Sequence, residues 1–450
     1  MTFTEPLGAT SEGGTLELTR STLRTRGWHS VGAGRLGLAG LLVAGLVLTS
    51  SAAQTNLLLP QSVRPVPGWL AGPLGGKGID LGLGGTIAML ALMLFSYAVV
   101  IWAADRLSAR TVLIGIAALH ALVLLAPPLF STDVFSYIAY GRMGALYGAS
   151  PYLHGPSAIA LDPLYPFIGA QWVSTPTVYG PLFTGLSYLL SPFDIAANVL
   201  AYKAIAAISS LTIVTVVWKA ASLRGLNPVK AIALVGLNPV IVLYGVGGGH
   251  NDLLMLAFLL TGVYVLLRQK ERTGGALIVT AIAVKLTAGL LLPFALAQSA
   301  GRRDGARSRR EVLTGFGAAA VLAGALGFAV FGTGPLHILG TLQTIQSQGG
   351  EHSISGLILT LLGLDHLRSA VGFVLDAAFL VWLAVLVRRV WRGELDWISG
   401  AGWATVALLV TASLLLPWYV GWLVPLAALS TDRRLLAATI VMTGIGMTTL

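Results

Sequence analysis

Long apolar runs separated by short polar segments recur along most of this 450-residue chain. A membrane-spanning α-helix needs about 20 apolar residues, whereas the strands of a membrane barrel are shorter and alternate. The runs therefore predict an all-α polytopic membrane protein with about 10–13 transmembrane or re-entrant helices. The predicted spans are 36–53, 81–104, 111–130, 195–217, 231–246, 253–267, 312–331, 371–387, 397–416 and 435–450.

Two apolar segments do not fit a simple crossing. Residues 179–192 are too short to span, so we interpret them as a juxtamembrane or re-entrant helix. Residues 274–297 are interrupted by Lys285 and Pro293 and have basic clusters at both ends, which predicts a bent pair of half-helices that returns to one side. Irregular backbone at membrane depth is tolerated only where it is buried in protein or lines a cavity. This pair therefore points to a functional site.

Composition supports the membrane class. Hydrophobic residues make up 55% of the chain and charged residues only 10%, against about 25% charged residues in an ordinary soluble domain. The absence of cysteine excludes disulfides, thiolate catalysis and cysteine-bound metals. The net charge of +10 does not indicate a nucleic-acid partner, because the basic residues lie in short clusters between apolar runs. The lipid bilayer is the expected surrounding.

The basic clusters predict the orientation in the membrane. Twenty of the 28 Lys and Arg residues lie in loops that share one side, if the N-terminus is cytoplasmic. Only Arg64, Lys77, Arg142, Lys203 and Arg368 lie on the other side. Short cytoplasmic loops carry an excess of Lys and Arg, so the N-terminus is expected inside and the loop 131–178 outside. The inside clusters are 20–35, 106–110, 219–230, 268–272, 302–310 and 388–392.

The domain organisation follows from this topology. Residues 1–35 are predicted to be a disordered cytoplasmic tail, and residues 36–450 a single transmembrane domain. The outer-face loop 131–194 is expected to carry the active site. The last apolar run ends at residue 450 without a polar tail, so we expect the protein to continue beyond it.

Asp133 is the first candidate for chemistry. It opens the long outer loop directly after an apolar run, at the expected boundary between membrane and water. One interpretation is that Asp133 only caps the helix that follows, because Ser, Thr and Asp favour that position. The other is that it acts as a general base, because a carboxylate at a cavity mouth can deprotonate a hydroxyl nucleophile.

The same loop carries candidate substrate-binding residues. Tyr137, Tyr152, Asp162 and Tyr179 combine aromatic rings with a carboxylate. A sugar ring presents an apolar C–H face with hydroxyls at its edge, so this combination suits a carbohydrate. Interfacial Tyr residues are also typical of the aromatic belt of membrane proteins, and that alternative stays open.

A second polar cluster follows the fifth predicted span. Gly247-Gly248-Gly249 precedes His250, Asn251 and Asp252, and the orientation puts these side chains on the same face as Asp133. The glycines alone would be explained as a helix C-cap, but the His-Asn-Asp that follows favours a functional site. Another outer loop contains His337, Glu351 and His352, yet no spacing matches a recognised metal site. A divalent cation is therefore left open as a cofactor, with no ligands assigned.

Two basic side chains lie inside apolar runs. An intramembrane charge is a functional hypothesis by default, because its burial is costly. Lys285, at the bend of the half-helix pair, is compact enough to meet a phosphate, and snorkelling to the interface is the alternative. His120 is interpreted as a hydrogen-bonded core histidine.

The motifs resemble one family in order and spacing. They are similar to the GT-C-fold, polyprenol-phosphomannose-dependent mannosyltransferases of actinobacteria, including the α-1,6-mannosyltransferases of lipomannan synthesis. The likeness covers about residues 111–430, although three predicted spans precede the first large outer loop, where the general GT-C pattern has one. The matching residues are Asp133-Val134-Phe135-Ser136-Tyr137 with Gly141-Arg142, Pro151-Tyr152, Tyr179-Gly180-Pro181-Leu182, Gly249-His250-Asn251-Asp252, and Lys285 with Leu292-Pro293.

The resemblance implies a function. The donor would be mannose linked to a polyprenyl phosphate, and the acceptor a glycan or glycolipid on the outer face of the cell membrane. Asp133 corresponds to the catalytic acidic residue of the family. A β-linked donor that gives an α product would invert at the anomeric carbon, which needs one base and positive charge for the departing phosphate. Arg142, His250 and Lys285 are the candidates for that charge, and Tyr137, Tyr152, Asp162, Tyr179, Asn251 and Asp252 for contacts with the sugars.

Two other classes remain open from the sequence. A polytopic transporter or lipid-linked sugar flippase would need a site reachable from both faces, and an inverted repeat would favour it. We find no such repeat in the sequence. A structural membrane scaffold would not require Asp133, His250 and Lys285 to converge.

Overall fold

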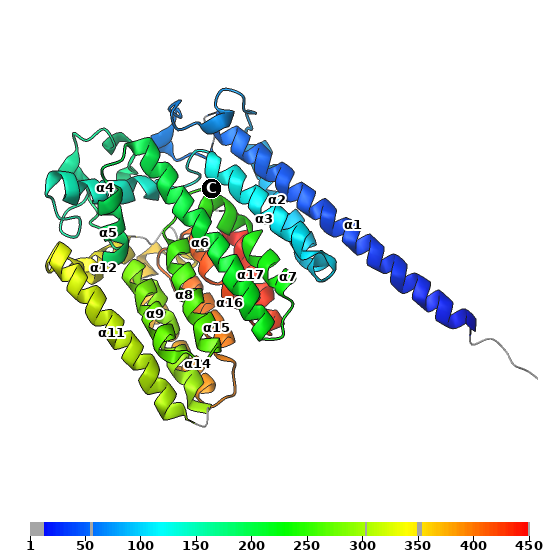
Figure 1. Ribbon diagram of the computed structural model, residues 1–450. Coiled ribbons are helices and arrows are strands. Elements are labelled where there is room, and N and C mark those ends of the chain that lie inside the picture. The colour runs from blue at the N-terminus through cyan, green and yellow to red at the C-terminus, as the bar shows by residue number, and fades with distance from the viewer. Residues whose placement is uncertain (1–12, 55–56, 302–303, 349–352, 449–450) are drawn as a thin grey trace, which may run out of the picture.

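The computed structural model describes residues 13–54, 57–301, 304–348 and 353–448. All regular elements within these residues are helices, which confirms the prediction of an all-α polytopic membrane protein (Figure 1). Five of the described helices are long and apolar enough to cross a membrane. They are α1 (Gly13–Ala52), α2 (Leu83–Ala103), α6 (Ile195–Leu223), α11 (Gly305–Phe331) and α14 (Arg368–Trp391).

A sixth apolar span is bent. Helix α7 (Pro228–Gly236) and the π-helical turn η7 (Val240–Val246) meet at an angle of 47°. Pro239 lies at the break, where it cannot donate a backbone hydrogen bond. The side chain of Asn238 satisfies two backbone donors at the break. Its Oδ1 accepts hydrogen bonds from the backbone N–H groups of Val240 (3.0 Å) and Ile241 (3.3 Å).

The remaining helices are shorter than a full crossing or lie in the loops. Short 3₁₀ turns, which include η3 (Ala104–Arg106), connect several of them. The helices are α3 (Ala109–Leu125), α4 (Asp133–Tyr147), α5 (Pro181–Leu190), α8 (Asp252–Leu267), α9 (Glu271–Val284), η8 (Leu286–Leu291), α10 (Leu292–Ala297), α12 (Ile338–Gln348), α13 (Ile354–Leu361), α15 (Trp397–Thr411), η13 (Pro417–Trp422), α16 (Val424–Ala428) and α17 (Arg433–Thr448).

The N-terminal segment differs from the sequence expectation. Helix α1 begins at Gly13, well before Leu36, so residues 13–35 of the expected disordered tail are helical in the structure. No proline interrupts the chain between Gly13 and Ala52, and the helix therefore continues through the polar residues without a break. Residues 1–12 of that tail lie outside the described residues.

The chain around Lys285 turns back as the sequence predicted. Helix α9 ends at Val284, and η8 and α10 then lead away from that end. Helix α11 starts beside the start of α9, where the guanidinium of Arg272 pairs with the carboxylate of Glu311. Both ends of the segment 271–301 therefore lie at the same end of the bundle, and Lys285 lies at its turning point.

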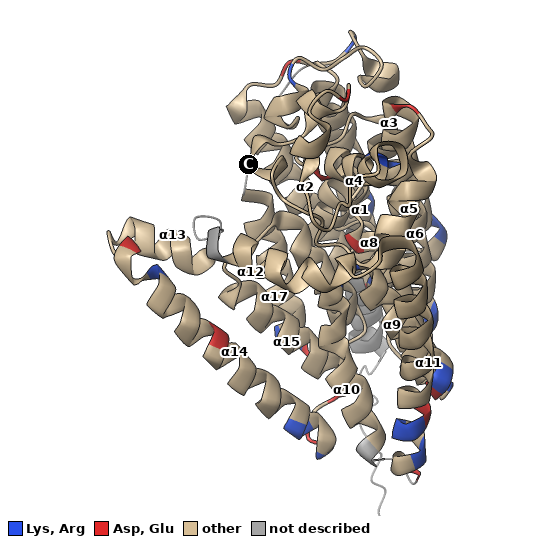
Figure 2. Cartoon of the chain, turned by 90° about the vertical axis from the view of Figure 1, so that its left-hand side faces the viewer, with Lys and Arg blue, Asp and Glu red and all other residues tan. Residues whose placement is uncertain are grey.

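The basic clusters gather at one end of the helix bundle. Contacts link cluster to cluster: Lys230 pairs with Asp105 (3.4 Å), Arg224 with Asp396 (3.0 Å), and the guanidinium of Arg309 lies over the ring of Trp391. Figure 2, in which Lys and Arg positions are blue on the ribbon, shows such positions at the start of α11 and the end of α14, at this end. The structure thus brings together clusters that lie far apart in the sequence.

The loop 131–180 and helices α4 and α5 lie at the opposite end (Figure 1). Glycine permits two close backbone approaches there. A Cβ at Gly141 would lie 2.2 Å from the backbone oxygen of Ser187, so α4 and α5 are in tight contact. A Cβ at Gly180 would lie 2.2 Å from the oxygen of Ala283, and the N–H of Gly180 donates to the oxygen of Val284 (3.0 Å). The loop is therefore fixed to the chain immediately before Lys285.

Candidate active site

A cavity of about 780 Å³, including its open mouth, lies at this end of the bundle. We call it the Asp133 cavity. Its walls come from α4, the loop before α5, the start of η8, α12 and the chain leading into η13. Three of the residues predicted from the sequence line it: Asp133, Tyr179 and Lys285.

The chain before α4 fixes the position of Asp133. The backbone N–H of Leu129 donates to the oxygen of Gly247 (3.1 Å), and that of Phe130 to the oxygen of Leu58 (2.7 Å). Phe130 has a φ of 62°, which is unusual for a bulky residue, and its ring stacks on Tyr244 with centroids 4.4 Å apart. These contacts fix the segment before α4 and therefore the position of Asp133 at the cavity.

The capping interpretation of Asp133 is wrong. Asp133 is the first residue of α4, the N-cap is Thr132, and no side chain makes a cap hydrogen bond. The carboxylate of Asp133 instead lies 3.5 Å (Oδ2) from Nδ1 of His250 and 3.4 Å from the hydroxyl of Tyr137. The side chain of Asp133 is 14% exposed. The carboxylate is thus held by its neighbours while it lines the cavity.

The surroundings of Asp133 keep its carboxyl ionised. Burial raises the pKa of Asp133, but the adjacent His250 and the charge of Lys285 outweigh it and lower the pKa below the ordinary value of 3.8. His250 is fully buried, and its ring stacks on Trp418 with centroids 3.9 Å apart. The structure therefore places His250 behind Asp133 and not in the cavity wall.

Lys285 supplies the positive charge of the cavity. It is the extended residue between α9 and η8, and its side chain is 11% exposed. Its Nζ lies 2.7 Å from Oδ1 of Asp252 and over the rings of Tyr419 (4.9 Å) and Trp422 (5.3 Å). Trp422 Nε1 donates to the same oxygen of Asp252 (2.6 Å), so the ion pair is enclosed by aromatic rings. Asp252 positions the cation rather than facing the cavity.

Three further predicted residues support the walls from behind. The hydroxyl of Tyr137, near Asp133, also lies 3.4 Å from Oδ1 of Asn251. Tyr152 is buried and donates to the backbone oxygen of Tyr179 (3.1 Å), next to Gly180. Neither Tyr137, Asn251 nor Tyr152 lines the cavity. These contacts give the three residue types a structural reason to lie near Asp133 and Tyr179, and their predicted contact with the substrate stays a prediction.

Arg142 and Asp162 were both predicted to contact the substrates. The structure pairs them with each other (Nη2 to Oδ2, 2.8 Å), and Asp162 also accepts from the hydroxyl of Tyr147 (2.8 Å) and the N–H of Leu164 (2.9 Å). Burial raises the pKa of Asp162, but these hydrogen bonds and the Arg142 charge lower it overall. Neither residue lines the cavity, and the pair joins α4 to the outer loop; their predicted contacts with a phosphate and a sugar stay predictions.

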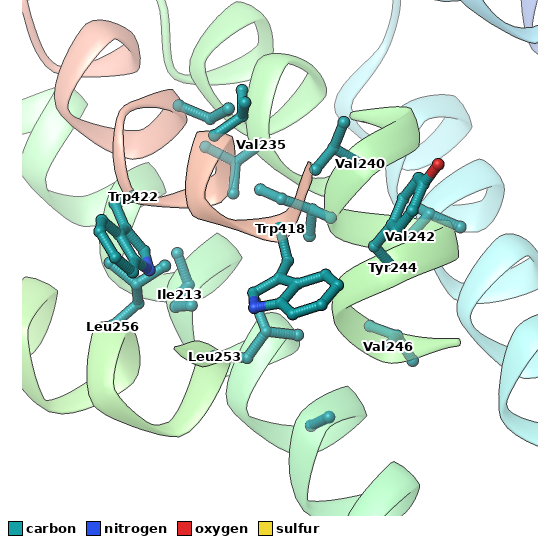
Figure 3. Packing of buried hydrophobic residues seen from close by; sticks show 14 of the residues in the cluster. Ile213, Val235, Val240, Val242, Tyr244, Val246, Leu253, Leu256, Trp418 and Trp422 are labelled. Atoms are coloured by element: carbon teal, nitrogen blue, oxygen red, sulfur yellow. The ribbon is translucent and has the colours of Figure 1, made fainter. Parts of the chain in front are cut away.

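Several lining residues were not predicted from the sequence. Ser136 and Tyr140 follow Asp133 at a spacing of three and seven, which places all three on one face of α4. Ser136 and Tyr140 could therefore have been predicted from their helical spacing relative to Asp133. Trp418 and Tyr419 come from η13, and Figure 3 shows Trp418 and Trp422 beside Leu253 and Leu256 of α8. Nothing in the sequence pairs η13 with α8.

Buried cations and histidines elsewhere have structural partners. His120 lies in α3 and bonds the backbone oxygen of Ile116 and Oγ of Ser210, each at 2.8 Å, which confirms its interpretation as a core histidine. Lys203, in α6, donates to the backbone oxygens of Ala126 and Pro127 at the end of α3. No group of three His, Asp or Glu side chains in the described ranges is placed to hold a metal ion. Glu351 and His352 lie outside those ranges.

Comparisons with known proteins identify the family. A family model described as the N-terminal domain of alpha-(1->6)-mannopyranosyltransferase matches residues 33–301. The chain belongs to this family. A second model, the MptB C-terminal domain, matches residues 349–450. The first match contains Asp133, His250 and Lys285, and the second contains η13, so both family domains contribute to the site.

Curated relatives support the assignment. The chain is 30% identical over 343 residues to alpha-(1->6)-mannopyranosyltransferase A of Mycobacterium tuberculosis, covering 70% of this chain and 64% of that protein. It is 29% identical over 370 residues to a probable alpha-(1->6)-mannopyranosyltransferase of Mycolicibacterium smegmatis (71% and 65%). It is 30% identical over 349 residues to alpha-(1->6)-mannopyranosyltransferase B of Corynebacterium glutamicum (68% and 56%). The chain spans less than two thirds of the length of these relatives.

Proposed function

We propose that this protein is a glycosyltransferase that moves mannose from a polyprenyl-phosphate-mannose donor to a hydroxyl of a glycan or glycolipid, forming an α-1,6 linkage. Family membership supports the mannosyl chemistry and the linkage. The observation that carries the mechanism is the Asp133 cavity, in which an ionised carboxylate and a buried lysine line the same space.

The chemistry is a single displacement. The acceptor hydroxyl attacks the anomeric carbon of mannose, a new C–O bond forms, and the bond from that carbon to the phosphate oxygen breaks. Asp133 takes the proton of the attacking hydroxyl on its carboxylate, which lines the cavity. The departing polyprenyl phosphate carries the negative charge, which Lys285 stabilises in a largely water-excluded site. Tyr179, Trp418 and Tyr419 provide aromatic surface for the sugars.

A transfer assay tests the donor. Purified protein is incubated with an oligomannoside acceptor and radiolabelled polyprenyl-phosphate-mannose or GDP-mannose. We expect label in the acceptor from the lipid-linked donor alone, because none of the described elements forms a soluble nucleotide-binding domain and Lys285 lies at the turn of an apolar segment, where a lipid phosphate can reach it. Transfer from GDP-mannose but not from the lipid-linked sugar would contradict the proposal.

The site is proposed to face the outside of the cell membrane, with the N-terminus in the cytoplasm. The basic clusters lie at one end of the bundle and the Asp133 cavity at the other, which the positive-inside rule supports. The chain has no cysteine, so a single introduced cysteine is the only thiol in the protein that a maleimide can label.

We expect Ser157→Cys, at an exposed position of the loop, to react with a membrane-impermeant maleimide in intact cells. The matched control is Ser222→Cys, exposed near the end of α6 at the basic end, which should react only after permeabilisation. The reverse pattern would overturn the orientation and move the site to the cytoplasmic face.

The transporter or flippase alternative receives less support. A transport site must be reachable from both faces, whereas the Asp133 cavity lies at one end of the bundle and is closed from the other by the Lys285–Asp252 pair and the packed residues of α8 and η13. The family is also named for sugar transfer and not for transport.

A further inference from the structure

His250 is a buried imidazole that faces the carboxylate of Asp133. It is 1% exposed, and its Nδ1 lies 3.5 Å from Oδ2 of Asp133. Within the described residues neither ring nitrogen has a hydrogen-bond partner, and the Asp133 carboxylate is the only charged group that pairs with the ring. Buried polar side chains without a hydrogen bond are rare in folded proteins, so each one needs an explanation.

The glycines before His250 make room for its ring. A Cβ at Gly248 would lie 2.9 Å from Nε2 of His250, so the ring lies directly against the backbone there. Gly249 has a φ of 68°, a left-handed conformation that glycine adopts at little cost. The ring also stacks on Trp418, with centroids 3.9 Å apart and 24° between the planes. Backbone and indole together therefore fix the imidazole beside Asp133.

This arrangement joins three parts of the chain. Asp133 begins α4, His250 lies between η7 and α8, and Trp418 belongs to η13. The first two lie in the first family domain and Trp418 in the second. His250 does not line the Asp133 cavity, whereas Lys285 does. The ring is thus placed to act on the carboxylate, and a direct contact with the donor phosphate is the alternative that an experiment has to separate.

We propose that His250 is a positioning residue for the general base: its imidazole, held by Trp418, fixes the Asp133 carboxylate in the orientation that accepts the proton of the acceptor hydroxyl. This inference rests on the proposed function and deepens it, because it assigns a role in the reaction to a side chain outside the cavity wall. The second family domain contributes to that role through Trp418.

Two substitutions separate the nitrogen of the ring from its shape. His250→Phe keeps an aromatic ring for the stack on Trp418 but has no Nδ1. His250→Asn loses the ring and keeps an N–H donor attached to Cγ, as Nδ1 is in histidine. We expect His250→Phe to lower kcat about 10²-fold, the order of loss when a catalytic group is misplaced by about 1 Å. His250→Asn should stay within about tenfold of the wild-type kcat, and donor and acceptor KM should change less than twofold in both variants.

The matched control is His154→Phe, the same change at an exposed position of the outer loop outside the cavity. It should keep wild-type kcat and KM. If His250→Phe does not fold, His250→Leu replaces it, because leucine also lacks the nitrogen and occupies less space. A raised donor KM with an unchanged kcat would assign His250 to the phosphate and overturn the proposal.

A double-mutant cycle with Asp133→Asn tests whether His250 acts through Asp133. Residues that act as one unit show strongly non-additive effects. Adding His250→Phe to Asp133→Asn should therefore lower kcat by less than about twofold further. A further loss as large as in the wild-type background would show that His250 acts independently of the base, and the proposal would be wrong.

The pH profile of kcat/KM gives a readout that a loss of packing alone would not change. Burial raises the pKa of Asp133, and His250 contributes most among the groups that lower it. Without His250 this pKa is higher, so the carboxylate is protonated, and lost as a base, at a higher pH. The acid limb of the profile should therefore move to higher pH in His250→Phe, whereas an unmoved limb would contradict the proposal.

The other groups around Asp133 are common to the compared proteins, so a shift of the limb reports on His250. They are Lys285 with its partner Asp252, and the phenols of Tyr137, Tyr140, Tyr179 and Tyr419. A wild-type protein that transfers no mannose from polyprenyl-phosphate-mannose would contradict the proposed function itself, and this inference with it. That outcome is read from the wild type alone and is distinct from the variant results.

Discussion

Asp133→Asn should lower the rate of mannosyl transfer by about 10²–10⁴-fold, the usual loss when a positioned general base is removed. Asparagine keeps the size of the side chain but cannot accept the proton of the acceptor hydroxyl. The structure shows no cap hydrogen bond from Asp133, so the change removes no helix cap. We therefore expect normal expression and membrane insertion, an unchanged affinity for the donor, and a kcat that is lower by this factor.

The matched control is Asp80→Asn, the same change at an exposed position outside the cavity. It should retain wild-type kcat and KM in the same assay with polyprenyl-phosphate-mannose and an oligomannoside acceptor. Near-normal turnover by Asp133→Asn would leave the carboxylate without a catalytic role. The base would then have to be sought at Asp252, the other carboxylate beside the cavity.

Lys285→Met should mainly weaken binding of the donor. Losing a charged hydrogen-bond donor to a phosphate costs about 1.5–3 kcal/mol, which corresponds to a rise of about tenfold to a hundredfold in donor KM. The KM for the acceptor should change little, because Lys285 is assigned to the donor phosphate and not to the acceptor. Steady-state kinetics with varied donor and fixed acceptor measures both effects.

The structure adds a complication to this variant, because Lys285 is paired with a buried carboxylate. Removing one partner of such a pair costs about 3–5 kcal/mol, and among the described residues Oδ2 of Asp252 already has no hydrogen-bond partner. The double variant Lys285→Met, Asp252→Asn removes both charges of the pair and keeps an acceptor oxygen for Trp422. The double variant should recover the stability that Lys285→Met loses, while its donor KM stays high. If its donor KM also returned to the wild-type value, Lys285 would have only a structural role.

The positions of the loops and the bend at Lys285 could be predicted from the sequence, because they follow from the pattern of charged and hydrophobic residues. The basic clusters predicted which loops share an end of the bundle, and contacts such as Arg224–Asp396 and Lys230–Asp105 join them there. The bend at Lys285 was predictable, because both flanks carry charges that belong to one side of a membrane. The close approach of Gly180 to α9 gives the Tyr179-Gly180-Pro181 motif a physical reason that was not apparent from the sequence.

Pairings between side chains could not be predicted. Arg142 was expected at a phosphate, yet it pairs with Asp162, because the fold of the loop brings together two residues whose spacing follows no helical period. Asp252 was expected at the sugar but neutralises Lys285, which lies on a different element. Trp422 closes this pair from η13, and only the tertiary packing of η13 on α8 makes that contact. Local patterns identify which residues are unusual but not which residue each one meets.

The configuration of the new linkage tests the central claim most directly. A single base and a single cation in one cavity predict one displacement, with inversion at the anomeric carbon. Purified wild-type protein is incubated with β-linked polyprenyl-phosphate-mannose and a synthetic mannoside acceptor, and the one-bond carbon–proton coupling of the new anomeric centre is measured by NMR. We predict an α-1,6-linked product, released together with an equal amount of polyprenyl phosphate. A β-linked product would contradict the account, because retention requires a second displacement and a covalent nucleophile.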